Sequence, residues 1–204
     1  MNDHYFSEQP NTQSQPRTWE TELKGHTFHF TSDEGVFSKR GVDLGTKLLV
    51  ESFQMPEVEG RLLDIGCGYG PIGLALAKTA PSREVMMIDV NERAVKLATE
   101  NAKQNGINNV QILKSDLFKQ VEGADFAAIL SNPPIRAGKK VVYQLFEEAY
   151  EHLLPEGEFW TVIRKQQGAS SALKKCQTLF PEVTVVLKKK GYVVMKGKKI
   201  IDSN

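Results

Sequence analysis

Short apolar runs alternate with amphipathic segments along most of this chain. The runs are rich in Val, Ile and Leu, and they end at Gly or at polar residues, which is typical of buried strands. The segments between them repeat apolar residues at helical spacing. The pattern predicts strands over 61–65, 84–89, 110–114, 124–130, 158–163, 183–187 and 192–196, and helices over 72–80, 92–105, 141–153 and 170–180.

This alternation predicts an α/β fold with a doubly wound, mostly parallel sheet of seven strands and helices on both faces. The Lys-Lys-Lys-Gly connection before Tyr192 is short, so we expect the last two strands to be antiparallel neighbours. Ahead of the sheet, the chain predicts a hairpin around Gly25 and a helix over 43–53. The expected organisation is a flexible arm over 1–17, a hairpin and helix over 18–56, and the sheet domain over 57–204.

Composition narrows the class of protein. The chain has 204 residues, of which 40% are hydrophobic, and no apolar run approaches the roughly 20 residues that span a bilayer. The N-terminus lacks a basic region followed by an apolar segment, so no secretory signal is expected. Cys67 and Cys176 lie far apart without metal-ligand or redox spacing, which predicts free thiols in a reducing cytoplasm. The four histidines form no ligand cluster, which argues against a metal hydrolase.

Charge is distributed unevenly along the chain. Residues 1–163 contain 16 Lys and Arg against 23 Asp and Glu, a net −7, whereas residues 164–199 contain 10 Lys and Arg against Glu182 alone, a net +9. A basic segment of this kind indicates a polyanion-binding face. Lysines that protect an exposed sheet edge from aggregation are an equally good interpretation at this point.

The first strand of the predicted sheet leads into Asp64-Ile65-Gly66-Cys67-Gly68-Tyr69-Gly70, directly before a helix. Glycines at alternate positions let the backbone pass close to a ligand without interference from Cβ atoms. In the dinucleotide fingerprint G-x-G-x-x-G, counted from Gly66, the third glycine position holds Pro71, so a ligand without phosphates is favoured. Asp64 supplies a carboxylate that suits a cationic amine.

Acidic residues follow the next two predicted strands. Asp89 ends the second strand, 19 residues after Gly70, where a carboxylate can accept hydrogen bonds from both hydroxyls of a ribose. The third strand leads to Ser115-Asp116, a polar pair placed to reach an adenine amino group. Each acidic residue alone could be a cap or a turn residue. Together, at successive strand ends, they predict one cleft along the carboxyl edge of the sheet.

The fourth predicted strand ends at Ser131-Asn132-Pro133-Pro134. Both prolines have a fixed φ and no N–H, and each restricts the residue before it to extended geometry. We therefore expect free carbonyls, with the Asn132 side-chain oxygen and the Pro133 carbonyl paired to accept from a planar –NH2 group. On this motif alone, an ordinary strand-ending proline turn is the alternative.

The glycine loop, Asp89, Asp116 and Asn132-Pro133-Pro134-Ile135 together resemble the class I S-adenosylmethionine-dependent methyltransferases, over about residues 40–199. The resemblance implies their Rossmann-like fold and S-adenosylmethionine as cofactor. It implies that Asp64 and the loop Gly66, Cys67, Gly68, Tyr69 and Gly70 hold the methionine moiety. Asp89 with the adjoining Val90 would hold the ribose, Ser115 and Asp116 the adenine, and Asn132 would border the transferable methyl group.

The segment from Ser131 to Lys139 is similar to the small-subunit ribosomal RNA guanine-N2 methyltransferases, as are Gly35-Val36-Phe37-Ser38, Asp43-Leu44-Gly45-Thr46 and Gly191-Tyr192. Some members of that family carry two tandem units, and this chain matches the catalytic one. The resemblance implies methyl transfer to the exocyclic N2 amine of a guanine. It also implies a cytoplasmic enzyme, with ribosomal RNA or the small ribosomal subunit as partner, and leaves open a monomer or a homodimer.

Substrate contacts are expected around the Asn-Pro-Pro turn. Asn132 and Pro133 would orient the amine and stabilise its developing charge, with Pro134 fixing the turn. Ile135 replaces the aromatic ring familiar in enzymes that methylate adenine N6 or glutamine amides. Phe37 is a candidate stacking platform instead, or an ordinary core residue. Candidate contacts to RNA are Ile135, Arg136, Lys139, Lys140, Arg164, Lys165 and Gln167.

Three further functions stay open at this point. Two are other methyl transfers, to adenine N6 or to a protein glutamine amide. The third is a module that binds S-adenosylmethionine or RNA without catalysis, against which the intact Asn132-Pro133-Pro134 turn argues, because a pure binder needs no paired acceptors for an amine.

Overall fold

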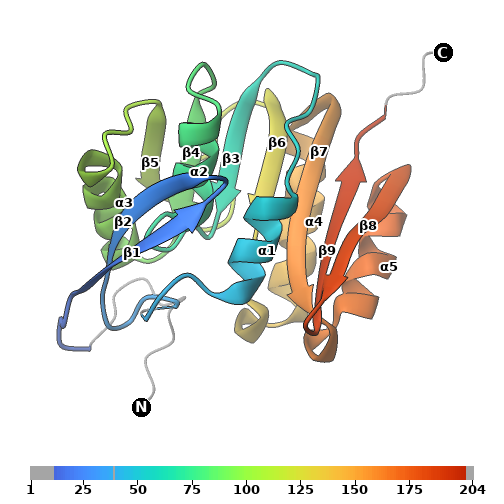
Figure 1. The fold of residues 1–204 in the computed structure, drawn as a ribbon. Coiled ribbons are helices and arrows are strands. Elements are labelled where there is room, and N and C mark those ends of the chain that lie inside the picture. Colours follow the sequence, from blue (N-terminus) through green and yellow to red (C-terminus); the bar gives the residue numbers. More distant parts are fainter. Residues whose placement is uncertain (1–11, 39, 201–204) are drawn as a thin grey trace.

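The computed structural model describes residues 12–38 and 40–200, and it consists of a hairpin and a helix followed by a seven-stranded sheet (Figure 1). The strands are β1 Arg17–Leu23, β2 His26–Ser32, β3 Arg61–Ile65, β4 Val85–Asp89, β5 Val110–Lys114, β6 Phe126–Ser131, β7 Leu153–Arg164, β8 Glu182–Lys189 and β9 Tyr192–Lys198. The α-helices are α1 Leu44–Ser52, α2 Pro71–Thr79, α3 Glu92–Gln104, α4 Lys139–His152 and α5 Ala169–Leu179, and short 3-10 turns occupy η1 Ile135–Ala137 and η2 Lys165–Gln167.

The strand order of the large sheet is β5-β4-β3-β6-β7-β9-β8, and it confirms the predicted doubly wound topology. Strands β3 to β7 pair in parallel, whereas β9 pairs antiparallel with both β7 and β8. The order reverses between β3 and β6, because the chain builds outward from β3 toward β5 and then returns to the other side of β3. In doubly wound sheets, ligands bind beyond the carboxyl ends of the strands at such a reversal.

Most predicted elements are confirmed to within a few residues, and β7 is the largest exception. This strand begins at Leu153, directly after α4, rather than at Glu158. Its pairing with β6 shifts register between Phe126 and Ala128, so that Phe126 faces Leu153 and Ala128 faces Glu158. The extra residues of β7 form a bulge around Pro155 and Gly157.

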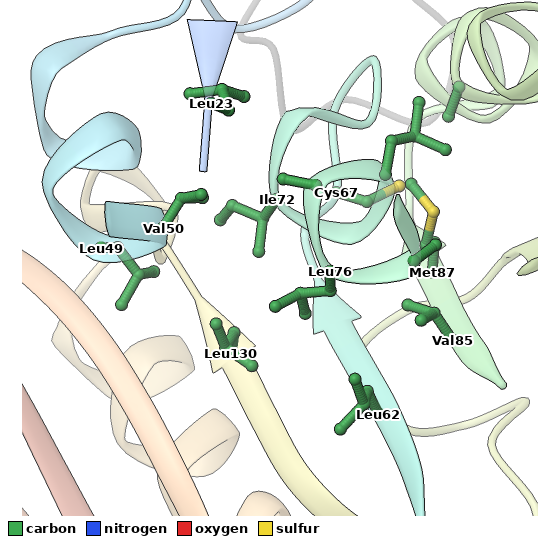
Figure 2. Close-up of a cluster of buried hydrophobic side chains, with 14 of the residues drawn as sticks. Leu23, Leu49, Val50, Leu62, Cys67, Ile72, Leu76, Val85, Met87 and Leu130 are labelled. Carbon is green, nitrogen blue, oxygen red and sulfur yellow. The ribbon is translucent and has the colours of Figure 1, made fainter. Parts of the chain in front are cut away.

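Side chains of the central strands alternate between two cores, one on each face of the sheet. On one face, Leu62 packs with residues of the hairpin, α1, α2 and α3. Figure 2 shows Leu23, Leu49, Val50, Ile72, Leu76 and Leu130 of this cluster turned toward one another. On the opposite face, Leu63 packs with residues of α4 and α5 and their neighbours, including Phe146 on α4, Phe159 on β7 and Phe180 just after α5. The two cores hold the strand ends rigidly, which fixes the loops that follow them.

The hairpin is attached to α3 through paired asparagines. Asn101 accepts from the N–H of Thr31 at 2.8 Å and donates to its carbonyl at 2.9 Å. Asn105 makes the same two bonds with His29, at 2.9 and 2.8 Å. These bonds satisfy the open edge of β2 as a further strand would. The hairpin is therefore fixed against the sheet domain.

The predicted arm lies largely outside the described residues, because residues 1–11 are not described. The part that is described contacts the segment after β2. Ser14 Oγ and the N–H of Gln15 donate to Asp33, at 2.7 and 2.5 Å, and Arg93 donates to the carbonyl of Thr12 at 2.8 Å. Strand β1 begins at Arg17, the last residue assigned to the arm.

Two expectations from composition can be compared with the described residues. Within residues 12–38 and 40–200, no helix is long and apolar enough to cross a membrane. Cys67 and Cys176 are both free and buried, as their spacing predicts.

Candidate active site

A cavity of about 220 Å³ opens at the carboxyl edge of the sheet, beside the ends of β3, β4 and β6. The predicted site residues that line it are Phe37, Gly66, Gly68, Asp89, Val90, Ser115, Asp116, Asn132, Pro133 and Pro134. The remaining wall is apolar, with Val36, Ile88 and Leu117 among its members. The structure thus brings together the glycine loop, three strand-end polar groups and the Asn-Pro-Pro turn.

The glycine loop forms part of the cavity wall, where the backbone of Gly66 and Gly68 is not covered by side chains of their own. Gly66 and Gly68 have φ of 71° and 57°, a region that favours glycine. A Cβ added to either residue would meet no atom within 4 Å, so both glycines leave open space. The N–H groups of Gly66 and Cys67 both donate to the carbonyl of Ile88, each at 2.9 Å. The loop is therefore held in place against β4.

Asp89 connects the loop to the next strand. One carboxylate oxygen accepts from the N–H of Gly68 at 2.8 Å, and the other accepts from the N–H of Asn91 at 2.9 Å. Burial raises the pKa of Asp89 to about 6, and these backbone bonds oppose the rise. Each carboxylate oxygen has lone pairs left for a second donor. Asp89 can therefore accept from the paired hydroxyls of a ribose.

Asp64 lies beneath the loop rather than in the cavity wall. It is fully buried, and its Oδ2 accepts from the N–H of Gly73, in the first turn of α2, at 2.8 Å. Burial raises the pKa of Asp64 to about 7; the bond from Gly73 lowers it, and repulsion from Asp89 adds to the rise. Among the described residues, Oδ1 has no hydrogen-bond partner. Through this hydrogen bond Asp64 links β3 to α2 and supports the glycine loop that joins them.

Cys67, Tyr69 and Gly70 also lie away from the cavity. The ring of Tyr69 is buried against Trp19 and Phe30, with both contacts edge-on at 5.4 and 5.5 Å between centroids. Gly70 is the N-cap of α2 with φ of 107°. The side chain of Cys67 is buried in the same core cluster. These three residues therefore support the loop through packing and backbone conformation.

Ser115 and Asp116 directly follow β5, the strand next to β4. Ser115 is buried, and its hydroxyl donates to the carbonyl of Leu117 at 2.6 Å, which fixes the turn after β5. Asp116 is exposed and forms an ion pair with Lys119. Both residues line the cavity, and Asp116 presents a carboxylate to it.

Asn132 is oriented by two residues that precede the sheet. Its Nδ2 donates to Oδ2 of Asp43 at 3.3 Å and to Oγ1 of Thr46 at 3.1 Å. With Nδ2 held in this way, Oδ1 is the polar atom that Asn132 can offer to a ligand in the cavity. The strand beneath it is fixed as well, because Ser131 Oγ donates to the carbonyl of Ile65 at 2.9 Å.

The carbonyls of the proline turn correct one sequence-based expectation, since they are not free. The carbonyl of Pro133 accepts from the N–H of Ile135, and that of Pro134 accepts from the N–H of Ala137, both at 2.8 Å. These bonds arise because the chain turns tightly into η1. The Pro133 oxygen keeps a second lone pair, so it can still accept from an amine.

The predicted substrate residues differ in their relation to the cavity. Phe37 is 40% exposed and lines the cavity. Ile135 instead packs against the core cluster that contains α4. The exposed polar residues of the rim lie in η1 and η2, at the start of α4 and at the end of β7, and none of them lines the cavity: Arg136, Lys139, Lys140, Arg164, Lys165 and Gln167. Arg164 is ordered by Tyr192, whose hydroxyl accepts from Nε at 2.8 Å and whose ring lies 5.0 Å from the guanidinium carbon.

The sequence analysis missed the roles of Asp43, Thr46 and Asn91. Asn91 is the N-cap of α3, and its Nδ2 also donates to the carbonyl of Gly35 at 2.9 Å. This bond holds the segment that carries Val36 and Phe37 over the cavity. Asp43 and Thr46 stood within a motif quoted for the family resemblance, and no spacing rule links them to Asn132.

The site fits S-adenosylmethionine by three features of its own residues. Gly66 and Gly68 leave open space beside the loop. The partly buried carboxylate of Asp89 suits ribose hydroxyls, and the apolar wall suits an adenine ring. Together with the doubly wound sheet and its antiparallel β9, these features define an S-adenosylmethionine-dependent methyltransferase.

Comparison with known proteins identifies the family. The sequence model of the methyltransferase small domain family matches residues 27–196. The chain therefore belongs to that family.

Several similar proteins are named as ribosomal RNA methyltransferases. The "Uncharacterized protein YbxB" of Bacillus subtilis is 59% identical over 98% of this chain and all of its own length. The "Ribosomal RNA small subunit methyltransferase C" of Aeromonas hydrophila is 38% identical over 63% of this chain and 37% of its own. The "16S rRNA N2 G1207 methyltransferase (RsmC)" of T. thermophilus, solved with AdoMet and guanosine, superimposes with a TM-score of 0.80 at 28% identity, over 93% of this chain and 52% of its own. This chain thus spans about half, or less, of the named ribosomal RNA methyltransferases.

Proposed function

We propose that this protein transfers a methyl group from S-adenosylmethionine to the exocyclic N2 amine of a guanine in ribosomal RNA. The observation that carries the proposal is the orientation of Asn132. Its Nδ2 is bound by Asp43 and Thr46, which leaves Oδ1 as the acceptor that Asn132 can offer, and both Asn132 and Pro133 line the cavity. Two acceptors so placed match the two N–H bonds of a planar amine.

The chain's own residues supply orientation and electrostatic stabilisation. When bound, the cofactor supplies an electrophilic methyl group on a sulfonium. Asn132 Oδ1 and the Pro133 carbonyl would hold the amine so that its nitrogen lone pair faces the cavity. The same two oxygens would stabilise the positive charge that develops on the nitrogen. No base is required, because the acidic product ammonium loses a proton to water.

Guanine is favoured by the residues that border the turn. Ile135 packs into the core, so the position after Asn-Pro-Pro provides no aromatic platform. Phe37, on the segment held by Asn91, lines the cavity and remains partly exposed. It is suited to stack on a base that has left its own stack. Adenine N6 and a protein glutamine are the competing acceptors.

An RNA substrate accounts for the charge of the rim. The residues after η1 and β7, together with the β8–β9 turn at 188–190, place exposed lysines and arginines at the carboxyl edge of the sheet. Figure 1 places that turn at the same end of the sheet as the end of β7. Its location at this edge favours a polyanion-binding face over protection of a sheet edge. The two free thiols favour a cytoplasmic location, where ribosomes assemble.

The test uses labelled S-adenosylmethionine with 16S and 23S ribosomal RNA, both naked and in isolated subunits, followed by nucleoside analysis. Labelled N2-methylguanosine is the expected product. N6-methyladenosine or label in protein would replace the proposal by one of the competing acceptors, and binding without any transfer would leave a binding module. The variant Asn132→Ala should lower kcat about 100-fold or more, while calorimetry gives a cofactor Kd within about twofold of wild type.

A further inference from the structure

We propose that Asp43 and Thr46 are positioning residues that fix the direction of the Asn132 carboxamide and thereby aim its oxygen at the acceptor amine. The inference rests on the proposed function, because it concerns the group assigned to hold the amine. Both residues lie at the start of the helix that precedes the sheet, 89 and 86 positions away from Asn132. Neither lines the cavity.

Asp43 divides its two carboxylate oxygens between two tasks. Oδ1 accepts from the N–H groups of Gly45 and Thr46, at 2.9 and 3.3 Å, and so caps the N-terminus of α1. Oδ2 accepts from Nδ2 of Asn132. The cap fixes the plane of the carboxylate, so the second oxygen is directed before Asn132 binds it.

The N-terminus of α1 is itself held firmly against the sheet. Leu49 and Val50, on the next turn, are fully buried. At Gly45 the helix approaches the ring of Tyr192 so closely that an added Cβ would lie 2.7 Å from its Cε1. The two acceptors therefore sit on a rigid element, and that element also contacts the residue that orders Arg164.

The chemistry of a carboxamide makes this orientation consequential. An Asn side chain offers an acceptor at one end and donors at the other. If it turned over, its NH2 would face the substrate NH2, and two donors cannot form a hydrogen bond. The turned side chain would also place Oδ1 against the Asp43 carboxylate, where two acceptors repel. Asp43 and Thr46 thus favour the one orientation that can hold an amine.

The Asp43 charge adds a second effect. A hydrogen bond from Nδ2 to a carboxylate polarises the amide and makes its Oδ1 more negative. A more negative oxygen stabilises positive charge on the amine better in the transition state than in the ground state. The effect of Asp43 is therefore expected in kcat rather than in substrate affinity.

The decisive variant is Asp43→Asn, which keeps an N-cap of equal quality and nearly the same shape. The substitution removes the charge at position 43. The end of the new side chain that does not cap the helix then presents an NH2 group to Nδ2 of Asn132. We expect kcat to fall about 100-fold, with the KM for RNA and the cofactor Kd within about twofold of wild type. An unchanged kcat would overturn the proposal.

Two substitutions of Thr46 form a matched pair of variants that leaves the capping side chain of Asp43 unchanged. Thr46→Val keeps the shape and removes the hydroxyl acceptor, and the loss of one neutral hydrogen bond should lower kcat about fivefold to tenfold. Thr46→Ser restores the hydroxyl and should recover most of the rate. A loss of rate in Thr46→Ser with an unaffected Thr46→Val would show that the methyl group, and hence packing, is what matters, and would overturn the role of the hydroxyl.

A double variant separates positioning from an independent contribution. If Asp43 acts through Asn132, then Asp43→Asn combined with Asn132→Ala should be no slower than Asn132→Ala alone. A further loss that multiplies with the first would overturn the proposal. Thermal unfolding of each variant provides the control, since a purely structural role would lower the unfolding temperature together with kcat.

A measurement without RNA keeps this inference distinct from the proposed function. The Asn132 side-chain 1H–15N amide resonances, assigned by their loss in Asn132→Ala, should shift in Asp43→Asn and in Thr46→Val and stay near wild type in Thr46→Ser. Unshifted resonances in Asp43→Asn would overturn the contact. If wild type makes no N2-methylguanosine while these shifts occur, the substrate assignment fails and the orientation of Asn132 stands.

Discussion

The free energy of unfolding of the variant Asp64→Asn should rise relative to that of wild type as pH rises. Asp64 is fully buried, and its Oδ1 has no partner among the described residues. Because burial raises the pKa of its carboxyl from 3.8 to about 7, the folded protein keeps a proton that the unfolded chain has released. The stability this proton provides is complete below about pH 4, and it is lost as pH rises through about 7.

The magnitude follows from linkage. A pKa of 3.8 in the unfolded chain and about 7 in the folded protein corresponds to about 4 kcal/mol over the full range, of which about 3 kcal/mol is lost between pH 5 and pH 8. The carboxamide that Asp64→Asn introduces cannot titrate, so the variant lacks this loss. Its buried NH2 group costs about 1–3 kcal/mol, and this cost is the same at every pH. The informative quantity is therefore the difference between the two pH profiles.

Urea unfolding without cofactor measures both profiles, followed by the fluorescence of Trp160, which is buried in the core. Between pH 5 and pH 8, the free energy of unfolding of wild type should fall by about 3 kcal/mol more than that of Asp64→Asn. Glu22→Gln, at an exposed position of β1, is the matched control and should run parallel to wild type. Parallel profiles for wild type and Asp64→Asn would refute the reasoning, because the burial cost would then not reside in this carboxylate.

Three further predictions concern binding and turnover. Asp89→Ala removes the carboxylate that holds Gly68 and lines the cavity, and calorimetry should show a cofactor Kd raised about 100-fold if Asp89 binds the ribose. A change below about threefold would contradict that role. Phe37→Ala should lower kcat/KM for RNA about tenfold to 100-fold while Phe37→Trp retains it, and equal effects would exclude stacking. Replacing 188–190 by glutamines should reduce the slope of log affinity for RNA against log salt by about 2 to 3, whereas Lys96→Gln with Lys103→Gln on α3 should leave it unchanged.

The fold was predictable because its signals are local. Buried strands and amphipathic helices differ in period, and the caps at Asn91 and Gly106 are read from a few neighbouring residues. The common location of the site residues was also predictable from the sequence, because parallel strands place Gly66, Asp89 and Asn132 at one edge of the sheet. The bulge in β7 was missed, because the register against β6 depends on Phe126, far away in the chain.

Details of the site were less predictable, since they depend on contacts between distant segments. The motif places Tyr69 in the cofactor loop, but the hairpin supplies Trp19 and Phe30, which draw its ring into the core. Pro133 was expected to offer a free carbonyl, yet the direction of η1 engages it with Ile135. In both cases the local sequence predicted the backbone conformation. Tertiary packing determined where the Tyr69 ring lies and which N–H group the Pro133 carbonyl accepts from.

The two halves of the site have different structural origins, and this separates cofactor binding from acceptor choice. Gly66, Gly68 and Asp89 follow strands of the sheet, so the cofactor side is built by the α/β topology itself. Phe37, on the segment held by Asn91, and Asp43, at the start of α1, come from elements that precede the sheet. Changes within 33–46 should therefore alter which amine is methylated while leaving cofactor affinity nearly intact, and a parallel loss of both would show that the two halves form one unit.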